Sequence, residues 1–507
     1  MKKKKIEPCD SNSPNPEPEL IKLVLEENTW QPARLFPITG IGGADEQERR
    51  GTSALLAVVQ SVREFGRALT SRCGAPGGVI ETFIEVPFTL NDKKLRPDGL
   101  IRVSRGKRTW TALVEVKTGR NGLDPDQINN YLDIARDQGF DAVITISHEI
   151  AVTPGVHPVL VDKRKLRKVE LFHLSWSRIH TEALIEQANN VVSDPDQAWI
   201  LSEFVRFIES PKSGAWDFED MGPRWVEVRD AAALQTLRAN SDDALAVVSK
   251  FDQLLAFAAM ELSRKLGVNV QQSLTKKERS DHALRIQAQS VLLANTGQLT
   301  GSLDVPDAAF GINIVVDLRA NRVDCSGMFM APTDGRPLTR INWLVRQLKD
   351  APDDLMISAS AARSRTPGST RTLKEVRENP SLLLDDPQAE VRSFTLTLSA
   401  KSGTKRGQGR GSFVGSVTAL VDSFYIGVVQ YLKNWSPAAP KPKSAPSANA
   451  QEVAVVVNPG PQVATPPQIV GASPEPPADE DLSGAVGDPK VDDSQINSQR
   501  QKMPPFG

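Results

Sequence analysis

The sequence predicts an α/β fold with more than one domain. The chain has 507 residues, of which 39% are hydrophobic and 24% are charged, and segments of helical periodicity alternate with short β-branched runs. A chain of this length is expected to hold roughly two to four domains, and this composition lets most of it bury a core. We therefore expect a mixed sheet covered by helices, followed by a second α/β or α+β domain.

The first domain is predicted over residues 29–195. Apolar residues at helical spacing predict a long helix from Asp45 to Leu69. Alternating or β-branched runs predict five strands: Val79–Phe88, Leu95–Val103, Trp110–Thr118, Asp141–Ser147 and Val169–Leu174. Asp124 followed by Pro125 predicts the start of a helix between the third and fourth strands, because Asp is a good N-cap and Pro suits the first helical position. A further helix reaches Ile185, and this order of elements is typical of an α/β domain with a mixed sheet.

The second domain is predicted over residues 196–435. Its clearest feature is a long amphipathic helix from Leu245 to Leu266, which ends at Gly267. The other expected elements are a hairpin, a helix, a strand and a last helix: Ile312–Leu318 with Arg322–Phe329, Ile341–Leu348, Phe394–Leu398 and Val414–Leu432. These elements place the domain in the α/β or α+β class without indicating its role.

The two ends of the chain differ from its middle. Residues 436–507 hold 14 of the 36 prolines and are acidic, so this tail is expected to be disordered because it buries too little apolar area to offset chain entropy. Residues 1–28 are expected to be mostly disordered as well. We predict neither a membrane span nor a secretory signal, since no run approaches about 18 apolar residues. The three cysteines are too few for a disulfide framework and fit a reducing cytoplasm, and the net charge of −1 still allows a local basic groove.

Charged residues interrupt two neighbouring predicted strands of the first domain. Glu115 and Lys117 are two residues apart on one strand and therefore point to the same face. Asp98 lies on the preceding strand, and antiparallel pairing of the two strands would put its carboxylate beside that of Glu115. Glu48 lies on the inward face of the first helix, so a third carboxylate can reach the sheet. Adjacent carboxylates with a lysine favour a hard divalent cation, and the lysine can orient water or offset developing phosphate charge.

This set of residues resembles the PD-(D/E)XK nuclease superfamily. Pro97-Asp98 matches its PD element, Glu115-Val116-Lys117 matches its (D/E)XK element, and Gln127 to Tyr131 (QINNY) matches the Q-hydrophobic-x-x-Y motif of the RecB-type branch. The resemblance covers residues 40–185 and implies an αβββαβ core, Mg²⁺ or Mn²⁺, and cleavage of phosphodiester bonds. The wider chain also resembles bacterial proteins described as stress-response factors.

The resemblance implies a role for each matching residue. Glu48, Asp98 and Glu115 would bind the metal together with the backbone carbonyl of Val116. Lys117 would position the nucleophilic water. Gln127 would orient Lys117 or the substrate, which would make Asp98, Glu115, Lys117 and Gln127 the catalytic set, with Tyr131 on the substrate side.

Each of these residues also has a purely structural interpretation. Asp45 and Glu48 fit a capping box, and Gln127 stands where it could act as a capping partner of Asp124. Tyr131 can be a core residue and Asp98 can belong to a turn. Glu115 and Lys117 can form a structural ion pair, although buried pairs stabilise poorly.

Basic residues outside this set are candidates for phosphate contacts. The run from Lys163 to Lys168 carries five cations, and it is either a substrate contact or a solvated loop. The substrate-binding candidates are Arg120, Lys163, Arg164, Lys165, Arg167 and Lys168.

Two hypotheses for the function follow. The first is a cytoplasmic, Mg²⁺- or Mn²⁺-dependent nuclease that acts on DNA, with a role in bacterial DNA repair, defence or stress response and a protein partner bound through residues 196–435 or the tail. The second is a nuclease-derived module that binds nucleic acid or protein without cleavage. The residues leave open DNA or RNA as substrate, endo- or exonuclease action, one or two metals, and the oligomeric state.

Limited proteolysis tests the predicted tail. Because residues 436–507 contribute little to a core, a protease should trim the chain to an end near Trp435 and leave a compact body. Mass spectrometry of the resistant fragment gives its end point. A tail that survives as long as the body would contradict the prediction.

Overall fold

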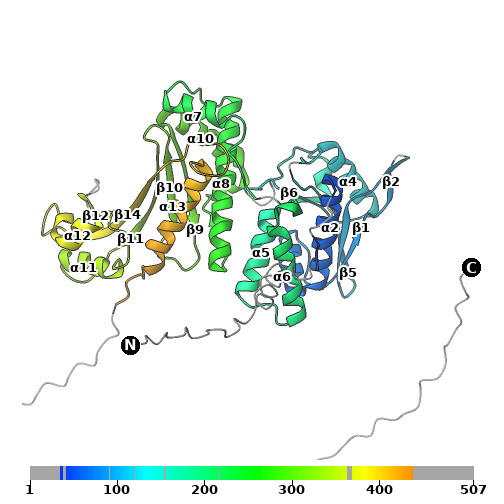
Figure 1. The fold of residues 1–507 in the computed structure, drawn as a ribbon, viewed down its shortest axis with the longest axis horizontal. Helices are drawn as coiled ribbons and strands as arrows, with labels where there is room; N and C mark the ends of the chain where they lie inside the picture. The colour runs from blue at the N-terminus through cyan, green and yellow to red at the C-terminus, as the bar shows by residue number, and fades with distance from the viewer. Residues whose placement is uncertain are drawn as a thin grey trace, which may run out of the picture. The chain divides into compact units, whose positions relative to one another are not determined.

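The computed structural model describes most of the chain between residues 35 and 437. The described ranges are 35–37, 42–90, 92–119, 121–152, 156–215, 217–361 and 368–437. Within them the chain is an α/β protein with a five-stranded sheet, a seven-stranded sheet and a two-stranded ribbon (Figure 1). The predicted segment 1–28 and the tail from residue 438 onward lie outside the described residues.

The five-stranded sheet is mixed, as the sequence predicts. Its strands stand in the order β1-β4-β5-β6-β7, with β1, β4 and β5 antiparallel and β5, β6 and β7 parallel. Their bounds are β1 (Val79–Ile84), β4 (Gly99–Arg105), β5 (Arg108–Val116), β6 (Ala142–Ser147) and β7 (Glu170–Ser175). Helix α4 (Pro125–Gln138) joins β5 to β6, because parallel neighbours require a crossover connection. Asp124 caps α4 as expected, and its side chain accepts the N–H of Asp126.

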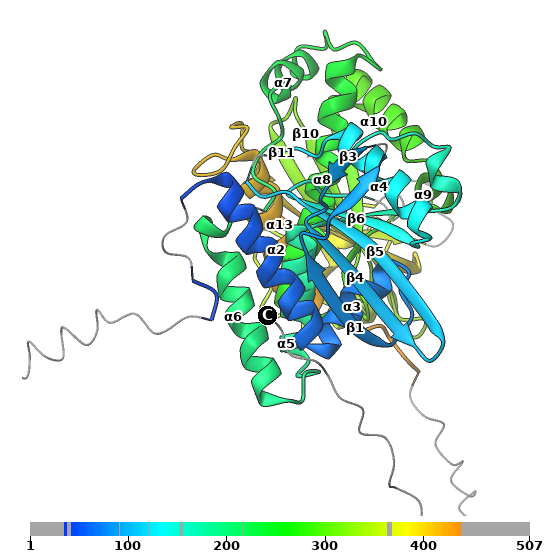
Figure 2. The ribbon, with the colours of Figure 1, turned by 90° about the vertical axis from the view of Figure 1, so that its right-hand side faces the viewer.

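Helices cover both faces of this sheet. Alternate side chains of β5 separate the two layers, since Val114 and Val116 belong to one apolar cluster and Leu113 belongs to the other. The first cluster packs against α2 (Ala44–Ser61), α3 (Arg63–Arg72), α5 (Trp176–Ala188) and α6 (Pro195–Glu209). The second packs against α4. Figure 2 shows α2 and α6 beside the strands of this five-stranded module, which we define as residues 44–213.

Three predicted elements are interrupted in the structure. The strand Val79–Phe88 breaks at Glu85, whose φ of 49° is left-handed, and resumes as β2 (Phe88–Leu90). The strand Leu95–Val103 breaks at Arg96-Pro97-Asp98 into β3 (Lys93–Leu95) and β4, because Pro has no N–H for the ladder. The pieces β2 and β3 pair with each other as a separate ribbon. The long first helix breaks at Val62, which is extended, into α2 and α3.

The boundary between the hydrophobic cores of the two sheets lies C-terminal to residue 195, the position at which the sequence predicts it. Helix α6 buries Leu201, Phe204 and Phe207 in the cluster of the five-stranded module, whereas Phe218 already belongs to the next cluster. The sequence signal, Asp194 followed by Pro195, marks the N-terminus of this helix and not the end of a domain. A helix start and a domain boundary have the same local chemistry, so packing alone distinguishes them.

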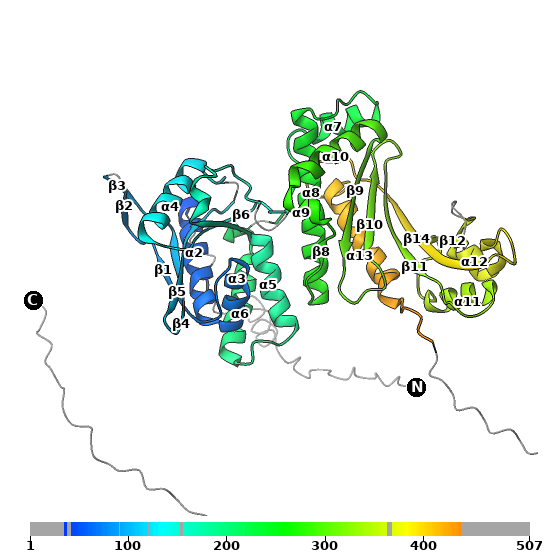
Figure 3. The same cartoon turned by 180° about the vertical axis from the view of Figure 1, so that it is seen from behind.

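The seven-stranded module comprises residues 217–432. Its sheet has the order β13-β12-β14-β11-β10-β9-β8, and all neighbouring strands in it are antiparallel. Its strands are β8 (Gln271–Gln272), β9 (Gln298–Asp304), β10 (Ile312–Asp317), β11 (Arg322–Met330), β12 (Met356–Ala361), β13 (Thr370–Thr372) and β14 (Val391–Lys401). Its helices are α7 (Trp225–Ala233), α8 (Asp242–Leu266), α9 (Lys276–Ser280), α10 (His282–Thr296), α11 (Pro337–Gln347), α12 (Leu373–Glu378) and α13 (Phe413–Gly427). The predicted amphipathic helix, hairpin and last helix correspond to α8, β10–β11 and α13, and Figure 3 shows α13 along this sheet from behind.

One helical segment of the described chain is apolar enough to need an explanation. Phe413–Tyr431 is long and apolar enough to cross a membrane by length and composition alone. Its Phe413, Val417 and Phe424 are buried in the core of the seven-stranded module, and α13 packs against β11 and β14. Burial against a sheet accounts for the apolar character of this helix.

Substitution of Gly99 tests how closely β4 approaches α2. A Cβ atom at Gly99 would lie 2.4 Å from Cδ1 of Leu56 and 3.2 Å from the carbonyl oxygen of Phe83. Gly99→Ala should therefore lower the free energy of unfolding by about 1–3 kcal/mol through overpacking. Gly122→Ala is the control, since a Cβ there has no neighbour within 4 Å. Urea unfolding that is equal for the two variants would contradict the close packing.

Candidate functional site

Asp98 and Glu115 meet where β4 and β5 pair. The two strands are antiparallel with Gly99 opposite Val114, which brings the residue before Gly99 beside the residue after Val114. Oδ2 of Asp98 accepts the backbone N–H of Val116 at 2.8 Å. The predicted adjacency of the two carboxyl groups is therefore confirmed, and Val116, predicted as a carbonyl ligand, also holds Asp98 through its N–H.

Lys117 connects the carboxylates of two elements. Its Nζ lies 2.7 Å from Oε1 of Glu115 on β5 and 3.0 Å from Oε1 of Glu48 on α2. Glu115 and Lys117 therefore point to the same side, as their two-residue spacing predicts. Lys117 and the Tyr131 hydroxyl both interact with the carboxylate of Glu115. The side chain of Glu115 is only 1% exposed, so these contacts are needed to offset the cost of burying its charge.

The structure decides between the two interpretations of Glu48. Helix α2 begins after Gly43, with no side-chain hydrogen bond at its N-cap, so the capping box of Asp45 and Glu48 does not form. The carboxylate of Glu48 instead accepts a hydrogen bond from Nζ of Lys117, which is 69 residues away in the chain.

Gln127 and Tyr131 form the fourth part of the site. They share a face of α4, and Nε2 of Gln127 donates to the Tyr131 hydroxyl at 2.9 Å. The same hydroxyl lies 3.4 Å from the carbonyl oxygen of Arg96, and it also interacts with Glu115. Tyr131 is thus both a buried core residue and a polar contact of the site, and Gln127 bonds to Tyr131 and not to the N-terminus of α4.

Burial and like charge shift the pKa values of these groups upward. Burial, together with the charge of Asp98, raises the pKa of Glu115 to about 7. Burial also raises the pKa values of Asp98 and Glu48, although hydrogen bonds to Val116 and Lys117 oppose the respective shifts. For Lys117, burial alone lowers the pKa, but Glu115 and Glu48 outweigh it and raise the pKa overall. Lys117 therefore remains a cation at neutral pH, whereas Glu115 changes its protonation state near neutral pH.

The oxygen ligands that this site offers match in part those that a hard divalent cation prefers. Asp98 and Glu115 present adjacent carboxylates, which are the oxygen ligands that such a cation prefers. The third predicted ligand, Glu48, is engaged by Lys117. In the described part of the chain no group of three or more His, Cys, Asp or Glu side chains is arranged as a metal site. Two carboxylates are thus in position, and the third would have to leave Lys117 to join them.

The predicted basic contacts have different outcomes. Arg120 lies outside the described residues. Within the run that begins at Lys163, Arg164 pairs with Asp162 at 2.7 Å, and Lys165 pairs with Asp133 of α4 at 2.7 Å. Three other cations of the run are exposed: Lys163, Arg167 and Lys168. The run includes a short 3₁₀ turn fastened to α4 and is therefore not a fully solvated loop.

Three charged residues beside the site escaped the sequence analysis. Glu85 lies at the break after β1, and its backbone N–H donates to the carbonyl oxygen of Asp98 at 3.0 Å. Its carboxylate contacts Arg49 of α2 and Arg96, which precedes Asp98 by two residues. A positive φ at a non-glycine residue has no clear signature in the sequence, whereas the position of Arg49 directly after Glu48 could have drawn attention to it.

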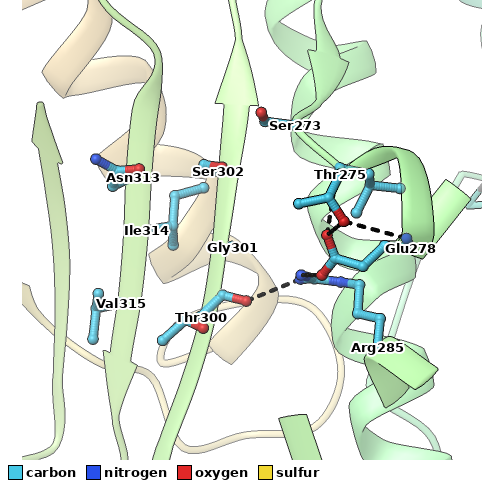
Figure 4. A pocket seen from close by; sticks show the side chains of 11 residues that line it. Ser273, Thr275, Glu278, Arg285, Thr300, Gly301, Ser302, Asn313, Ile314 and Val315 are labelled. Carbon is cyan, nitrogen blue, oxygen red and sulfur yellow. Dashed lines mark hydrogen bonds and ion pairs between the residues drawn. The ribbon is translucent and has the colours of Figure 1, made fainter. Parts of the chain in front are cut away.

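The seven-stranded module has a polar hollow of its own, of about 590 Å³. Figure 4 shows Thr300, Ser302 and Asn313 of the strands facing the α9–α10 region across it. Its buried Arg285 binds Asp252 and also donates to Glu278 and to the carbonyl oxygen of Thr300. Because the guanidinium of Arg285 is bound by residues of this module, we interpret it as a structural group and not as a free ligand-binding charge.

Comparisons of the chain with protein-family models, with curated proteins and with solved structures find no match. The geometry of Glu48, Asp98, Glu115 and Lys117 therefore carries the functional argument alone.

The pKa of Glu115 predicts how metal binding depends on pH. Below about pH 7 a cation must displace a proton from Glu115, so the affinity for Mn²⁺ should rise with pH and level off above that value. Glu115→Gln should remove most of the affinity and the pH dependence. Calorimetric titration at several pH values measures both.

The control for this experiment is Glu182→Gln. Glu182 is a buried carboxylate of the same module that pairs with Arg72 at 2.8 Å. It should keep the wild-type affinity and pH profile. Equal loss of Mn²⁺ binding in both variants would remove Glu115 from the ligand set.

Proposed function

We propose that the five-stranded module is a metal-dependent nuclease of the PD-(D/E)XK type that hydrolyses phosphodiester bonds of DNA. The order of its main elements supports this proposal. Apart from the additional helix α3 and the β2–β3 ribbon, the chain runs through a helix, three antiparallel strands, a helix and a parallel strand, which are α2, β1, β4, β5, α4 and β6. We further propose that the protein acts in the cytoplasm, in bacterial DNA repair, defence or stress response, with residues 196–435 or the tail contacting a partner.

One observation carries the proposal. Glu115 is a buried carboxylate beside a second carboxylate, and its pKa is raised to about 7 although the Lys117 ammonium lies 2.7 Å from its Oε1. A purely structural ion pair is expected to favour the charged form of its carboxylate, whereas here burial and the charge of Asp98 outweigh Lys117. Perturbed pKa values that cluster at one point are typical of functional sites. Glu48, Asp98, Glu115 and Lys117 form such a cluster.

Asp98 and Glu115 are the residues that would hold Mg²⁺ or Mn²⁺. When bound, the cation supplies positive charge to the phosphate and makes a water nucleophile available at neutral pH. Backbone tethering of Asp98 by the N–H of Val116 keeps its carboxylate oriented toward Glu115. The carbonyl of Val116 and the carboxylate of Glu48 complete the proposed ligand set.

Lys117 acts in this proposal as a hydrogen-bond donor. Its raised pKa keeps the ammonium protonated, so it cannot remove a proton from water in this arrangement. It can hold the attacking water and offset the negative charge that develops on the phosphate. Gln127 and Tyr131 act as positioning residues, because their hydroxyl–amide pair lies against Glu115 and the backbone of Arg96.

A second candidate is a nuclease-derived module that binds nucleic acid without cleaving it. The observation that favours it is the closed contact of Lys117 with both Glu48 and Glu115, since this arrangement neutralises two carboxylates without a metal. The two candidates differ in one measurable property, which is turnover.

Lys117→Ala separates the two candidates. Loss of this donor should slow single-turnover cleavage of duplex or single-stranded DNA in Mg²⁺ or Mn²⁺ by roughly 10²–10³-fold, by analogy with the loss of one oxyanion donor. Metal binding should remain near wild type, because Lys117 is not a ligand. DNA binding should survive, because phosphate contacts are spread over several cations.

The matched control is Lys374→Ala, which removes an exposed lysine of α12 in the seven-stranded module. This variant should cleave at the wild-type rate. Cleavage at that rate by Lys117→Ala as well, or no cleavage by the wild type in either metal, would leave the binding module as the function.

A further inference from the structure

A carboxylate and two arginines stand at the edge of the proposed nuclease site. Oε2 of Glu85 lies 3.2 Å from Nη1 of Arg96, and its Oε1 lies 3.7 Å from Nε of Arg49. One carboxylate thus engages two guanidinium groups, each through a different oxygen. The side chains of Arg49 and Arg96 are 76% and 64% exposed, so both remain accessible from solvent.

Both arginines are neighbours of site residues along the chain. Arg49 directly follows Glu48 on α2, and Arg96 precedes Asp98 by two residues. The two guanidinium groups therefore come from separate elements and converge on Glu85, whose charge in turn acts on Asp98. A phosphodiester that reaches Asp98 and Glu115 must approach several negative charges, and these two cations are placed to offset that repulsion.

The backbone holds Glu85 in this position at some cost. Its φ of 49° lies in the left-handed region that side chains other than glycine rarely occupy. Such a conformation is energetically unfavourable and is concentrated at functional sites. The N–H of Glu85 donates to the carbonyl oxygen of Asp98, so the same strained residue is fastened to the site.

The contacts between Glu85 and the arginines are weak enough to exchange. Ion pairs between exposed side chains contribute little to stability, because water screens them. A phosphodiester also offers two oxygens to guanidinium groups and forms charge-assisted hydrogen bonds with them. The carboxylate of Glu85 therefore presents to the arginines the same two-oxygen pattern as a backbone phosphate.

We propose that Arg49 and Arg96 form a clamp for a backbone phosphate of the substrate strand, and that Glu85 occupies this clamp until the phosphate replaces its carboxylate. This inference rests on the proposed nuclease function and assigns a phosphate-binding site at the edge of it. Glu85 keeps the two guanidinium groups oriented in the free protein and makes DNA compete for them.

The test measures binding of a labelled DNA duplex by fluorescence anisotropy at several salt concentrations, in the Lys117→Ala background so that the DNA stays intact. Glu85→Gln should tighten binding by roughly threefold to tenfold, because the competing charge is gone. Arg49→Ala and Arg96→Ala should each weaken binding and lower the salt slope of log K by about 0.9, the value for one lost phosphate contact.

Two further variants separate a specific clamp from general repulsion. Glu81→Gln removes the same charge from an exposed residue of β1, the strand that ends just before Glu85, and should change DNA affinity little. Glu85→Gln added to the Arg49→Ala/Arg96→Ala variant should also have little effect, because the clamp is already absent. Equal tightening by Glu81→Gln and Glu85→Gln, or an undiminished effect of Glu85→Gln without the arginines, would overturn the clamp.

The clamp and the nuclease function fail in different ways. Cleavage is measured with Lys117 intact. If the wild type cleaves DNA and the Arg49→Ala and Arg96→Ala variants bind and cleave DNA equally well, the clamp is wrong and the nuclease function stands. If no cleavage occurs while the arginine variants lose DNA affinity and salt slope, the clamp stands as a DNA-binding site and the nuclease function is wrong. If the wild type neither binds nor cleaves DNA, both are overturned.

Discussion

The arrangement of the five-stranded module depends on neutralising a carboxylate inside a sheet. Glu115 is buried between Asp98 and Lys117, where an unpaired charge would be strongly unfavourable. Lys117 reduces this cost and at the same time reaches Glu48, so one ammonium joins β5 to α2. The close approach that this contact requires is helped by Gly99, whose position has no room for a side chain against Leu56.

The seven-stranded module contains a buried charge with a different outcome. Asp252 is fully buried, and Arg285 donates to both of its oxygens at 2.9–3.1 Å. The charge of Asp252 is compensated by hydrogen bonds to both of its oxygens, as expected of an ion pair that only stabilises a fold. Glu115 is similarly buried, yet burial and the charge of Asp98 outweigh Lys117 and raise the pKa of Glu115 to about 7. The contrast between the two carboxylates supports a chemical role for Glu115 more strongly than its burial alone.

Breaks in regular structure place the charged groups of the site. Pro97 ends the ladder before Asp98, and the left-handed Glu85 ends β1 on the neighbouring strand. Between these two breaks the chain forms the β2–β3 ribbon, which returns Arg96 to the carboxylate of Glu85. If the strands Val79–Phe88 and Leu95–Val103 were unbroken, Glu85 and Arg96 would take regular positions in the sheet and the β2–β3 ribbon would not form.

The sequence by itself determined the features that depend on local spacing. The two-residue interval between Glu115 and Lys117, the N-cap at Asp124 and the four-residue interval between Gln127 and Tyr131 each follow from the geometry of one strand or one helix. Tertiary structure alone decided which interpretation of Glu48 holds, that α6 belongs to the first core, that Lys165 binds Asp133, and that Glu85 faces two arginines. Each of these depends on contact between segments that are far apart in the chain or on a strained φ, and the free energy of such contacts comes from packing that no local pattern of residues encodes.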